Sequence, residues 1–443
     1  MALSGLDIYK LLPKTNCREC GFVTCLAFAM QLAKKAVAIE KCPHLSPEAK
    51  NILEASGQPP IRLVSIGTGE TKLDTGRETV IFRHEEKFHN PCGIGFIIED
   101  NLTGEEIKKR LEKINKLKFE RVGQALDVNL VAIKQNTAKD NFIKAVKLVN
   151  DNTKLNLILI AKDIAALDEA LKITKARRPL IYCLEYTDYI ALSKLAKDYS
   201  VPMVVYAKEL GKLSEITAGI EKNGVSDLVL DTGKKSIKDK IWDLTQIRRL
   251  ALKKSNRSVG FPVLTIAENT DPYEEAIEAA TYIAKYASIV LLKGIETAEV
   301  LSLLTLRQNI YTDPQKPLQI EPGLYPIGDA NNSSPVLITT NFSLSYYTVL
   351  GEVEATKIPS YILSVDTEGM SVLTAWAAEK FTPEKISLSL EKFSVKDKVS
   401  HNKIIIPGYV AVMSGDLEET SGLKVIVGPK EAAGIPSFLK NLN

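Results

Sequence analysis

The stretch LNLILIAKDIAALDEALKITKARRPLIYCLE, residues 155–185, decides the fold of most of this chain. It contains a short apolar run, a segment with the apolar spacing of an amphipathic helix, and a second apolar run. Short apolar strands joined by helices are typical of parallel βαβ units, whose strands are buried on both faces. The stretch therefore predicts one such unit.

The same alternation extends in both directions along the chain. Other β-type runs are IRLVSIG (61–67), ETVIFR (78–83), CGIGFIIE (92–99), LDVNLVAIK (126–134), PMVVYA (202–207), DLVLD (227–231), PVLTIAE (262–268) and SIVLLKG (288–294). From residue 126 onward each run is followed by a helix-like segment, and about eight units in some 230 residues predict a (β/α)8 barrel. The runs at 61–66 and 79–83 are too close together for a crossover helix, so we expect one of them to form a hairpin that closes the barrel bottom.

Different patterns flank the predicted barrel. Residues 1–57 read as small and helical, with a strong helix former at 25–39 and a further helix that has Ser46 as its N-cap and Pro47 at its first position. The last part alternates again, with strands in VLITTNF, SYILSVD, NKIIIPG and LKVIVGP, and predicts a doubly wound α/β unit. We therefore expect a helical domain at 1–57, a linker and barrel entry at 58–92, the barrel at 93–312, a linker rich in Pro, Gly and Asn at 313–335, and the doubly wound domain at 336–443.

Composition and charge exclude several classes of protein. The 443 residues carry a net charge of +3, from 57 basic and 54 acidic side chains, which is no electrostatic footprint for nucleic acid. No run approaches the roughly 18 apolar residues of a membrane span, and the N-terminus has no core of signal-peptide length. We expect a cytoplasmic protein whose thiols stay reduced.

Four of the six cysteines lie close together near the N-terminus. Cys17, Cys20, Cys25 and Cys42 have the spacing C-x2-C-x4-C-x16-C, and Pro43 follows the last one. Structural zinc usually takes two close cysteine pairs, and only one is present here. Three closely spaced cysteines and a distant one before proline favour an iron–sulfur cluster held by four thiolates, with zinc and free thiols as the alternatives. Cys92 and Cys183 lie in apolar runs, and we interpret them as buried and inert.

Other polar signals are weak. The strand ends of the predicted barrel carry polar residues that fit either helix caps or a catalytic set: Asn136, Asp163, Glu185, Asp231, Glu268 and Asn269. In the last unit, loops containing Gly369, Gly408, Gly415, Gly428 and Gly434 follow strands, where doubly wound sheets bind ligands.

The segments NCRECGFVTC…KCPH (16–44) and DTEGMSVLTAW…GDLEETSGLKVIVGPKEAAGIP (366–436) carry a resemblance that extends over the whole chain. The sequence resembles the large (gamma) subunits of the corrinoid iron–sulfur proteins of the reductive acetyl-CoA pathway, and the related gamma subunits of acetyl-CoA decarbonylase/synthase. The resemblance implies an α/β protein with a small helical 4Fe-4S domain, a TIM barrel and a C-terminal Rossmann-like corrinoid-binding domain. It also implies a methyl carrier, one component of a corrinoid-dependent methyltransferase. Co(I) would accept methyl from methyltetrahydrofolate through a separate methyltransferase and deliver it to the nickel centre of acetyl-CoA synthase.

The resemblance also implies site residues and partners. The cluster of Cys17, Cys20, Cys25 and Cys42 would reductively reactivate Co(II), with electrons from a reduced ferredoxin-type donor. Thr374 would stand under cobalt without coordinating it, and no Asp-x-His-x-x-Gly loop offers an axial histidine. A small subunit would complete a heterodimer, and neither nucleic acid nor membrane is expected as a partner. The residues that match the family's corrin-binding segments are Thr340, Tyr346, Gly369, Met370, Ser371, Val372, Leu373, Thr374, Ala432, Ala433 and Gly434.

Two other interpretations stay open at the level of sequence. One is a ferredoxin-like electron-transfer protein fused to an inactive barrel. The other is a barrel methyltransferase that binds the pterin itself through Asn136, Asp163 and Asp231. The metal content and the acceptor of the methyl group distinguish the three interpretations.

Overall fold

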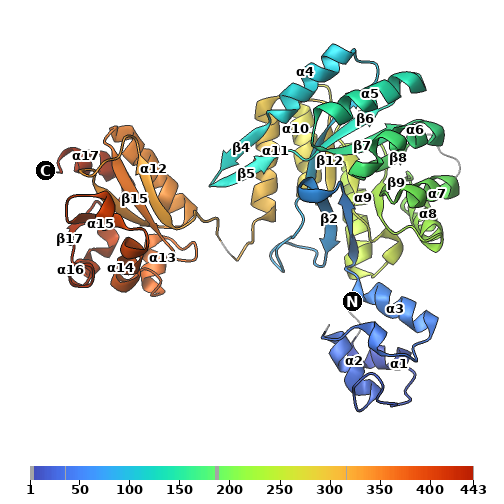
Figure 1. The fold of residues 1–443 in the computed structure, drawn as a ribbon, viewed down its shortest axis with the longest axis horizontal. Coiled ribbons are helices and arrows are strands. Elements are labelled where there is room, and N and C mark those ends of the chain that lie inside the picture. The colour runs from blue at the N-terminus through green and yellow to red at the C-terminus, as the bar shows by residue number, and fades with distance from the viewer. Residues whose placement is uncertain (1–3, 35, 185–188, 316, 443) are drawn as a thin grey trace. The chain divides into compact units, whose positions relative to one another are not determined.

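A computed structural model describes residues 4–34, 36–184, 189–315 and 317–442. The chain divides into two compact units, one of residues 1–119 with 126–311 and one of residues 120–125 with 312–443. Figure 1 shows the course of the chain through them. No helix among the described residues is long and apolar enough to span a bilayer.

The N-terminal part of the first unit is helical, as expected. Ser4, Thr24 and Ser46 cap its three α-helices, each accepting a backbone amide within the first turn. The helix predicted over 25–39 is wrong in its length, because it ends at Ala33 and the chain turns to bring Cys42 back toward the other cysteines. Phe28 is buried between the helices, with Ile8, Leu12 and Leu53. The elements are α1 (Gly5–Leu11), α2 (Cys25–Ala33), the 3-10 turn η1 (Ile39–Lys41) and α3 (Pro47–Gly57).

A hairpin closes one end of the barrel, as expected. Strands β1 (Ile61–Ile66) and β2 (Leu73–Glu78) pair antiparallel around the short turn η2 (Gly69–Thr71). Val64, Ile66 and Leu73 pack against side chains of the barrel interior. The β-type run at 79–83 is not a strand. The residues before it, from Leu73, form the second strand instead.

The barrel has eight parallel strands in the order β10-β9-β8-β7-β6-β3-β12-β11. It closes through a parallel bridge between Leu230 and Val263, beside a hydrogen bond of 2.8 Å from the Leu230 amide to the Pro262 carbonyl. The strands are β3 (Gly93–Glu99), β6 (Leu130–Lys134), β7 (Asn156–Ala161), β8 (Leu180–Cys183), β9 (Met203–Tyr206), β10 (Leu228–Asp231), β11 (Leu264–Ile266) and β12 (Ile289–Leu292).

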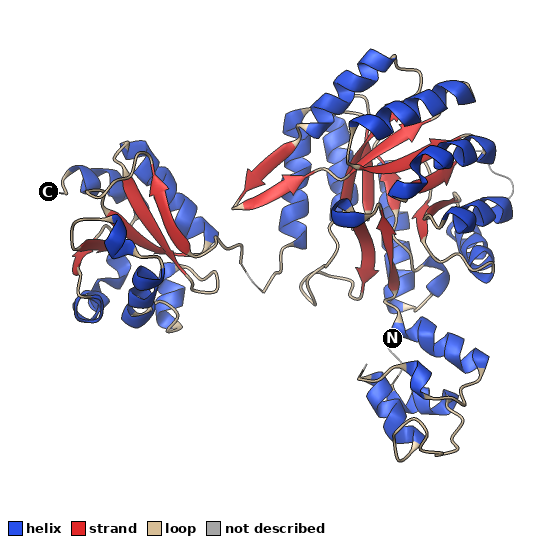
Figure 2. Cartoon of the chain, in the orientation of Figure 1, coloured by secondary structure: helices blue, strands red, loops and turns tan. Residues whose placement is uncertain are grey.

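A helix follows each strand and covers the outside of the barrel (Figures 1 and 2). Because both faces of the strands are buried, their sequences are continuous apolar runs rather than alternating ones. The helices are α4 (Gly104–Asn115), α5 (Lys139–Asn152), α6 (Ile164–Thr174), α7 (Tyr189–Tyr199), α8 (Leu210–Lys222), α9 (Ile237–Lys253), α10 (Pro272–Ala284) and α11 (Thr297–Tyr311). Smaller elements are the hairpin β4 (Lys118–Arg121) and β5 (Gln124–Asp127), and the turns η3 (Lys175–Arg177) and η4 (Arg257–Val259).

The second unit is a five-stranded sheet in the order β13-β15-β14-β16-β17. Four strands are parallel, as predicted: β14 (Val336–Thr340), β15 (Ser360–Val365), β16 (Lys403–Ile406) and β17 (Lys424–Val427). The fifth, β13 (Gly323–Ile327), pairs antiparallel with β15 and lies inside the segment expected to be a linker. That expectation missed a strand because Pro326 interrupts its pattern, and proline is tolerated on an edge strand.

Helices cover both faces of this sheet, which confirms the doubly wound arrangement. One face packs against α12 (Ser343–Thr356) and α17 (Ile435–Lys440). The other packs against α13 (Val372–Ala377), α14 (Pro383–Lys392), α15 (Val395–Lys398) and α16 (Ser414–Ser421). The 3-10 segments η5 (Gly408–Met413) and η6 (Ala432–Gly434) follow β16 and β17.

Candidate cofactor sites

The four N-terminal cysteines differ in exposure. Cys25 is buried at the first position of α2, Cys20 and Cys42 are half-buried, and Cys17 is exposed. Helix α2 presents its N-terminus at Cys25, where the helix dipole favours negative charge. The cysteines therefore line a small surface that opens to solvent on the side of Cys17.

The loop before α2 has an unusual backbone. Asn16 and Arg18 have positive φ values of 50° and 67°, and Gly21 has 86°. The Asn16 amide donates to Cys25 Sγ at 3.4 Å, while the Cys25 amide donates to Asn16 Oδ1 at 2.8 Å. Left-handed residues turn successive amides toward one side, which is the backbone form that surrounds anionic groups in proteins.

Three of the thiols lie in one small hydrophobic cluster: Cys25 is part of the core of the helical domain, and Cys20 and Cys42 pack against it. Burial raises the pKa of Cys42, and the charges of Cys20, Cys25 and Cys17 raise it further, although a backbone hydrogen bond at His44 opposes them. Four thiolates at one site need metal cations to neutralise their charge. Four cysteine thiolates are the usual ligands of an iron–sulfur cluster. The residues present therefore fit an iron–sulfur cluster.

A surface ion pair joins the two cysteine segments. His44 Nε2 lies 3.1 Å from Glu19 Oε2, and both side chains are about half exposed. The ligand atoms of Cys17, Glu19 and His44 all lie within 4.8 Å of one another. The His44–Glu19 pair thus lies beside Cys17 on the open side of the cysteine cluster.

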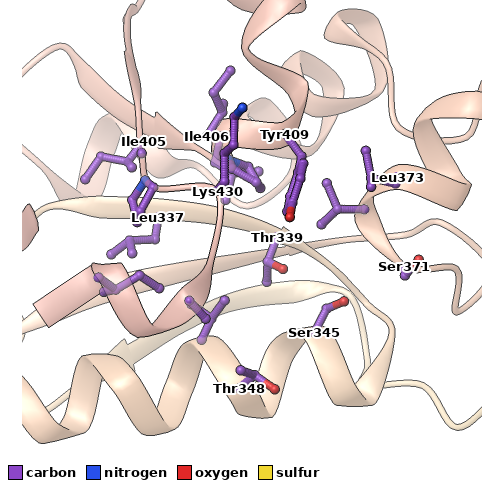
Figure 3. Close-up of a pocket in the computed structure, with 18 of the residues that line it drawn as sticks. Leu337, Thr339, Ser345, Thr348, Ser371, Leu373, Ile405, Ile406, Tyr409 and Lys430 are labelled. Carbon is purple, nitrogen blue, oxygen red and sulfur yellow. The ribbon is translucent and has the colours of Figure 1, made fainter.

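A second candidate site is a cavity of about 340 Å³ at the carboxyl ends of the strands of the second unit (Figure 3). It lies between the sheet and α12, and the loops after β15, β16 and β17 surround it. Its walls are mostly apolar, and Leu344, Leu373 and Tyr409 are exposed on its rim. The lining residues are Leu337, Ile338, Thr339, Phe342, Leu344, Ser345, Thr348, Val349, Ser371, Val372, Leu373, Ile405, Ile406, Pro407, Tyr409, Gly428, Pro429, Lys430, Ala432 and Ile435.

The structure brings some predicted corrin-binding residues to this cavity. Ser371, Val372, Leu373 and Ala432 line it. Thr374 is the next residue beyond them, and its hydroxyl lies 3.0 Å from that of Ser371.

Gly369, Ala433 and Gly434 are neighbours of the lining residues without lining the cavity themselves. Gly369 ends the turn before Ser371 with φ of 74°. Ala433 and Gly434 follow Ala432 in η6.

Three predicted residues are placed elsewhere. Met370 packs against the hydrophobic core on the other face of the sheet. Thr340 follows Val336 and Ile338 on that face by strand alternation, and its Oγ1 is buried without a partner among the described residues. Tyr346 is buried between Tyr325 and Tyr347, with ring centroids 5.1 and 5.3 Å away, and burial raises its pKa.

Sequence reasoning missed much of the cavity wall. Thr339 precedes the predicted Thr340, and Ser345 and Thr348 lie one turn apart on α12; Figure 3 shows their hydroxyls. Tyr409 lies in the segment that follows β16, and Lys430 lies in the segment that follows β17. The strand-end rule, applied to all strands and not only to β14 and β15, is the signal that would have found them.

His401 lies at the opposite end of the sheet. It precedes β16, its Nε2 lies 2.9 Å from the Ser334 carbonyl oxygen, and its Nδ1 accepts the Lys403 amide at 3.2 Å. Both ring nitrogens are thus engaged away from the carboxyl ends of the strands.

The polar strand ends of the barrel have structural partners. Asp163 caps α6, and the Asn136 amide donates to buried Asp100. Asp231 is buried and accepts from the Tyr182 hydroxyl at 2.7 Å and from Lys240 Nζ at 3.0 Å.

Two of the remaining polar candidates of the barrel also have partners within the protein. Glu268 pairs with Lys234, Asn269 accepts the Asp271 amide, and Glu185 lies outside the described residues. Cys92 and Cys183 are buried, and burial raises the pKa of the Cys92 thiol to about 12, as fits an inert residue.

Comparison with known proteins shows the family of the chain and a match to an Fe–S family over the cysteine segment. A family model described as the CO dehydrogenase/acetyl-CoA synthase delta subunit matches residues 63–439, and one described as a putative Fe-S cluster matches residues 12–44. The corrinoid/iron-sulfur protein large subunit of Moorella thermoacetica is 46% identical over 441 residues, covering 99% of both chains. The acetyl-CoA decarbonylase/synthase complex subunit gamma of Methanothermobacter thermautotrophicus is 33% identical, over 100% of this chain and 99% of that one.

These matches define a class of corrinoid/iron–sulfur proteins of the acetyl-CoA pathway, whose sequence in this chain folds into an α/β barrel and a doubly wound unit. The chain belongs to the family of the large subunits of corrinoid/iron–sulfur proteins and the gamma subunits of acetyl-CoA decarbonylase/synthase. Among solved structures, the dihydropteroate synthase of Vibrio fischeri superposes with a TM-score of 0.41 and 13% identity, over 51% of this chain and 95% of that one.

Proposed function

We propose that this chain is a methyl carrier of acetyl-CoA synthesis and acts as one component of a corrinoid-dependent methyltransferase. A corrinoid supplies a cobalt centre that can accept and release a methyl group, and a 4Fe-4S cluster supplies single electrons. The observation that carries the proposal is the presence, in one chain, of a four-thiol cluster and an apolar cavity at the carboxyl ends of a doubly wound sheet.

In this proposal Cys17, Cys20, Cys25 and Cys42 hold the 4Fe-4S cluster. The Asn16 amide, which donates to Cys25 Sγ, and the N-terminus of α2 would face the negative charge of a thiolate-bound cluster. The partial exposure of Cys17 and Cys20 leaves an edge through which a reduced ferredoxin-type donor can deliver an electron.

The second unit holds the corrinoid through the residues that border its cavity. The apolar rim of Leu344, Leu373 and Tyr409 gives a macrocycle an apolar surface to lie against. Lining residues Ser371–Leu373 and Ala432 contact it, with Gly369, Thr374, Ala433 and Gly434 alongside. Thr340, Tyr346 and Met370 act behind this surface, by supporting the strand and loop that carry it.

We further propose that no histidine of this unit coordinates cobalt. His401 supports this, because both its nitrogens are engaged at the amino end of β16. A cobalt without a strong lower donor is easier to reduce, since axial ligation sets the potential of such centres.

Partners and location follow from the same family. The name of the Moorella relative points to a small subunit, with which this chain would form a heterodimer. Methyltetrahydrofolate methyltransferase would supply the methyl group, and acetyl-CoA synthase would receive it. The proposal places the protein in the cytoplasm, and assigns the cluster to residues 1–57, the barrel to 93–312 and the corrinoid to 336–443.

Metal analysis tests this function. The chain, purified without oxygen together with its small subunit, should hold about four irons and one cobalt, with the cobalt in an extractable corrinoid. Iron without cobalt would overturn the proposal in favour of an electron-transfer protein. Methyl transfer from methyltetrahydrofolate to free corrinoid by this chain alone would instead favour a pterin-binding barrel.

A further inference from the structure

One buried side chain connects three segments beside the cavity of the second unit. Asn341 directly follows β14 and is 1% exposed. Its backbone amide donates to the Val365 carbonyl at 2.8 Å, and its own carbonyl accepts the Ile320 amide at 2.9 Å. The residue therefore joins the ends of β14 and β15 to the chain segment before β13.

The side chain of Asn341 organises the turn that follows β15. Its Oδ1 accepts the amides of Thr367 and Gly369 at 2.9 and 3.1 Å, and the Thr367 hydroxyl lies 3.0 Å from it. Its Nδ2 donates to Gln319 and Asp366 at 3.2 and 3.3 Å. Both donors and the acceptor of this amide are thus used, as a buried polar group requires.

The turn needs such an anchor because its backbone is strained. Glu368 has φ of 57° and Gly369 has 74°, and the left-handed region is costly for a residue with a side chain. A Cβ at Gly369 would lie 2.6 Å from Gln319 Cγ, so the turn is also tightly packed. Without the Asn341 acceptor, the buried amides of Thr367 and Gly369 would lose their partner.

The turn leads directly into the wall of the cavity. Ser371 precedes α13, and its backbone carbonyl accepts the Ala375 amide at 2.7 Å. Ser371, Val372 and Leu373 line the cavity. The conformation of residues 366–370 therefore determines where these three side chains lie.

We propose that Asn341 is the positioning residue of the corrinoid site: through the turn 366–370 it fixes the loop that contacts the macrocycle, without touching the macrocycle itself. The inference rests on the proposed function, because it assigns the corrinoid to this cavity. It predicts that loss of the Asn341 amide lowers corrinoid affinity in protein that is still folded.

The test uses the full chain, coproduced with its small subunit in corrinoid-free cells and titrated with hydroxocobalamin. Asn341→Ala should weaken hydroxocobalamin binding about tenfold or more, because several hydrogen bonds that hold the loop are lost. The visible circular dichroism of the bound corrinoid should also change. Asn331→Ala is the matched control: Asn331 holds a turn before β14 through Ser333, at the other end of the strand. This variant should keep both the affinity and the spectrum.

The outcomes separate the two proposals. If wild-type protein does not bind hydroxocobalamin, the proposed function falls and this inference falls with it. If wild type binds and Asn341→Ala binds equally well with an unchanged spectrum, or if Asn331→Ala loses as much affinity, only the positioning role is overturned. Should Asn341→Ala fail to fold, Thr367→Val decides. It removes the hydroxyl that contacts both Asn341 Oδ1 and the Met370 carbonyl within the turn, and it should weaken binding by about threefold; unchanged binding would contradict the role.

Discussion

Asn16 and Cys25 are joined by two hydrogen bonds that run in opposite directions, the Asn16 amide donating to Cys25 Sγ and the Cys25 amide donating to Asn16 Oδ1. The asparagine side chain therefore fixes the buried cysteine at the start of α2, and its backbone faces the sulfur that would bind iron. Sequence spacing identified the four thiols, but it gave no indication of this residue.

Asn16→Ala should speed the release of iron. The substitution removes the acceptor of the Cys25 amide and costs about 1 kcal/mol of local stability. Thr24→Ala is the matched control, because it removes the N-cap bond to the Ala27 amide of the same helix and leaves the bond from Asn16 to Cys25 in place. The rate at which a chelator bleaches the visible absorbance of the cluster measures the effect. Equal rates for the two variants would contradict the role of Asn16.

Two adjacent threonines at the end of β14 place their side chains on opposite faces of the sheet. Thr339 lines the cavity, whereas the Thr340 hydroxyl is buried without a partner among the described residues. We expect Thr339→Val to weaken hydroxocobalamin binding by about 1 kcal/mol, through the loss of a hydroxyl from the cavity wall.

The same substitution at the next residue, Thr340, should change stability and not affinity. Thr340→Val keeps the shape of the side chain that supports β14, so it should leave hydroxocobalamin affinity unchanged. It should stabilise the unit by about 1 kcal/mol, because it removes an unsatisfied buried hydroxyl. Titration and thermal unfolding of the two variants decide between them. Loss of corrinoid in Thr340→Val, with normal binding in Thr339→Val, would show that the cavity is not the site.

These threonines also illustrate what a sequence can specify. The apolar runs predicted both α/β units, because parallel strands that are buried on both faces have nearly continuous apolar sequences. The sequence also predicted a site at the end of β14. Because successive side chains of a strand point to opposite faces, spacing alone does not say whether Thr339 or Thr340 faces the cavity. The early end of α2, the strand β13 and the bonds of Asn341 depend on contacts between distant segments, which spacing within one segment does not encode.

Two buried carboxyl groups give the first unit a pH-dependent stability. Glu299 on α11 lies beside Glu275 on α10, whose oxygens accept the amides of Lys293 and Gly294 at 2.7 Å. Burial first, and then the charge of Glu275, raises the pKa of Glu299 from 4.5 to about 8. Between pH 4.5 and about 8 the carboxyl group is protonated in the folded state and ionised in the unfolded state. Stability therefore falls as pH rises through this range and levels off above it.

Glu299→Gln should remove this dependence, because the amide stays neutral at every pH. We expect thermal unfolding of wild type and variant to be similar at acidic pH, and the variant to be the more stable at alkaline pH. Glu274→Gln, at an exposed position of the same helix α10, should follow the wild-type pH profile. Parallel profiles for wild type and Glu299→Gln would contradict the raised pKa.

The central claim is that electrons reach the corrinoid through the thiolate-bound cluster, and Cys20→Ala tests it most directly. Cys183→Ala, which alters a buried thiol of the barrel, is the control. The measurement is re-reduction of the oxidised corrinoid by reduced ferredoxin, followed by its visible absorbance. We predict that Cys20→Ala abolishes this reduction while chemically pre-reduced protein still accepts methyl at the wild-type rate, and that Cys183→Ala changes neither. Normal reduction in Cys20→Ala protein that lacks its cluster iron would contradict the account.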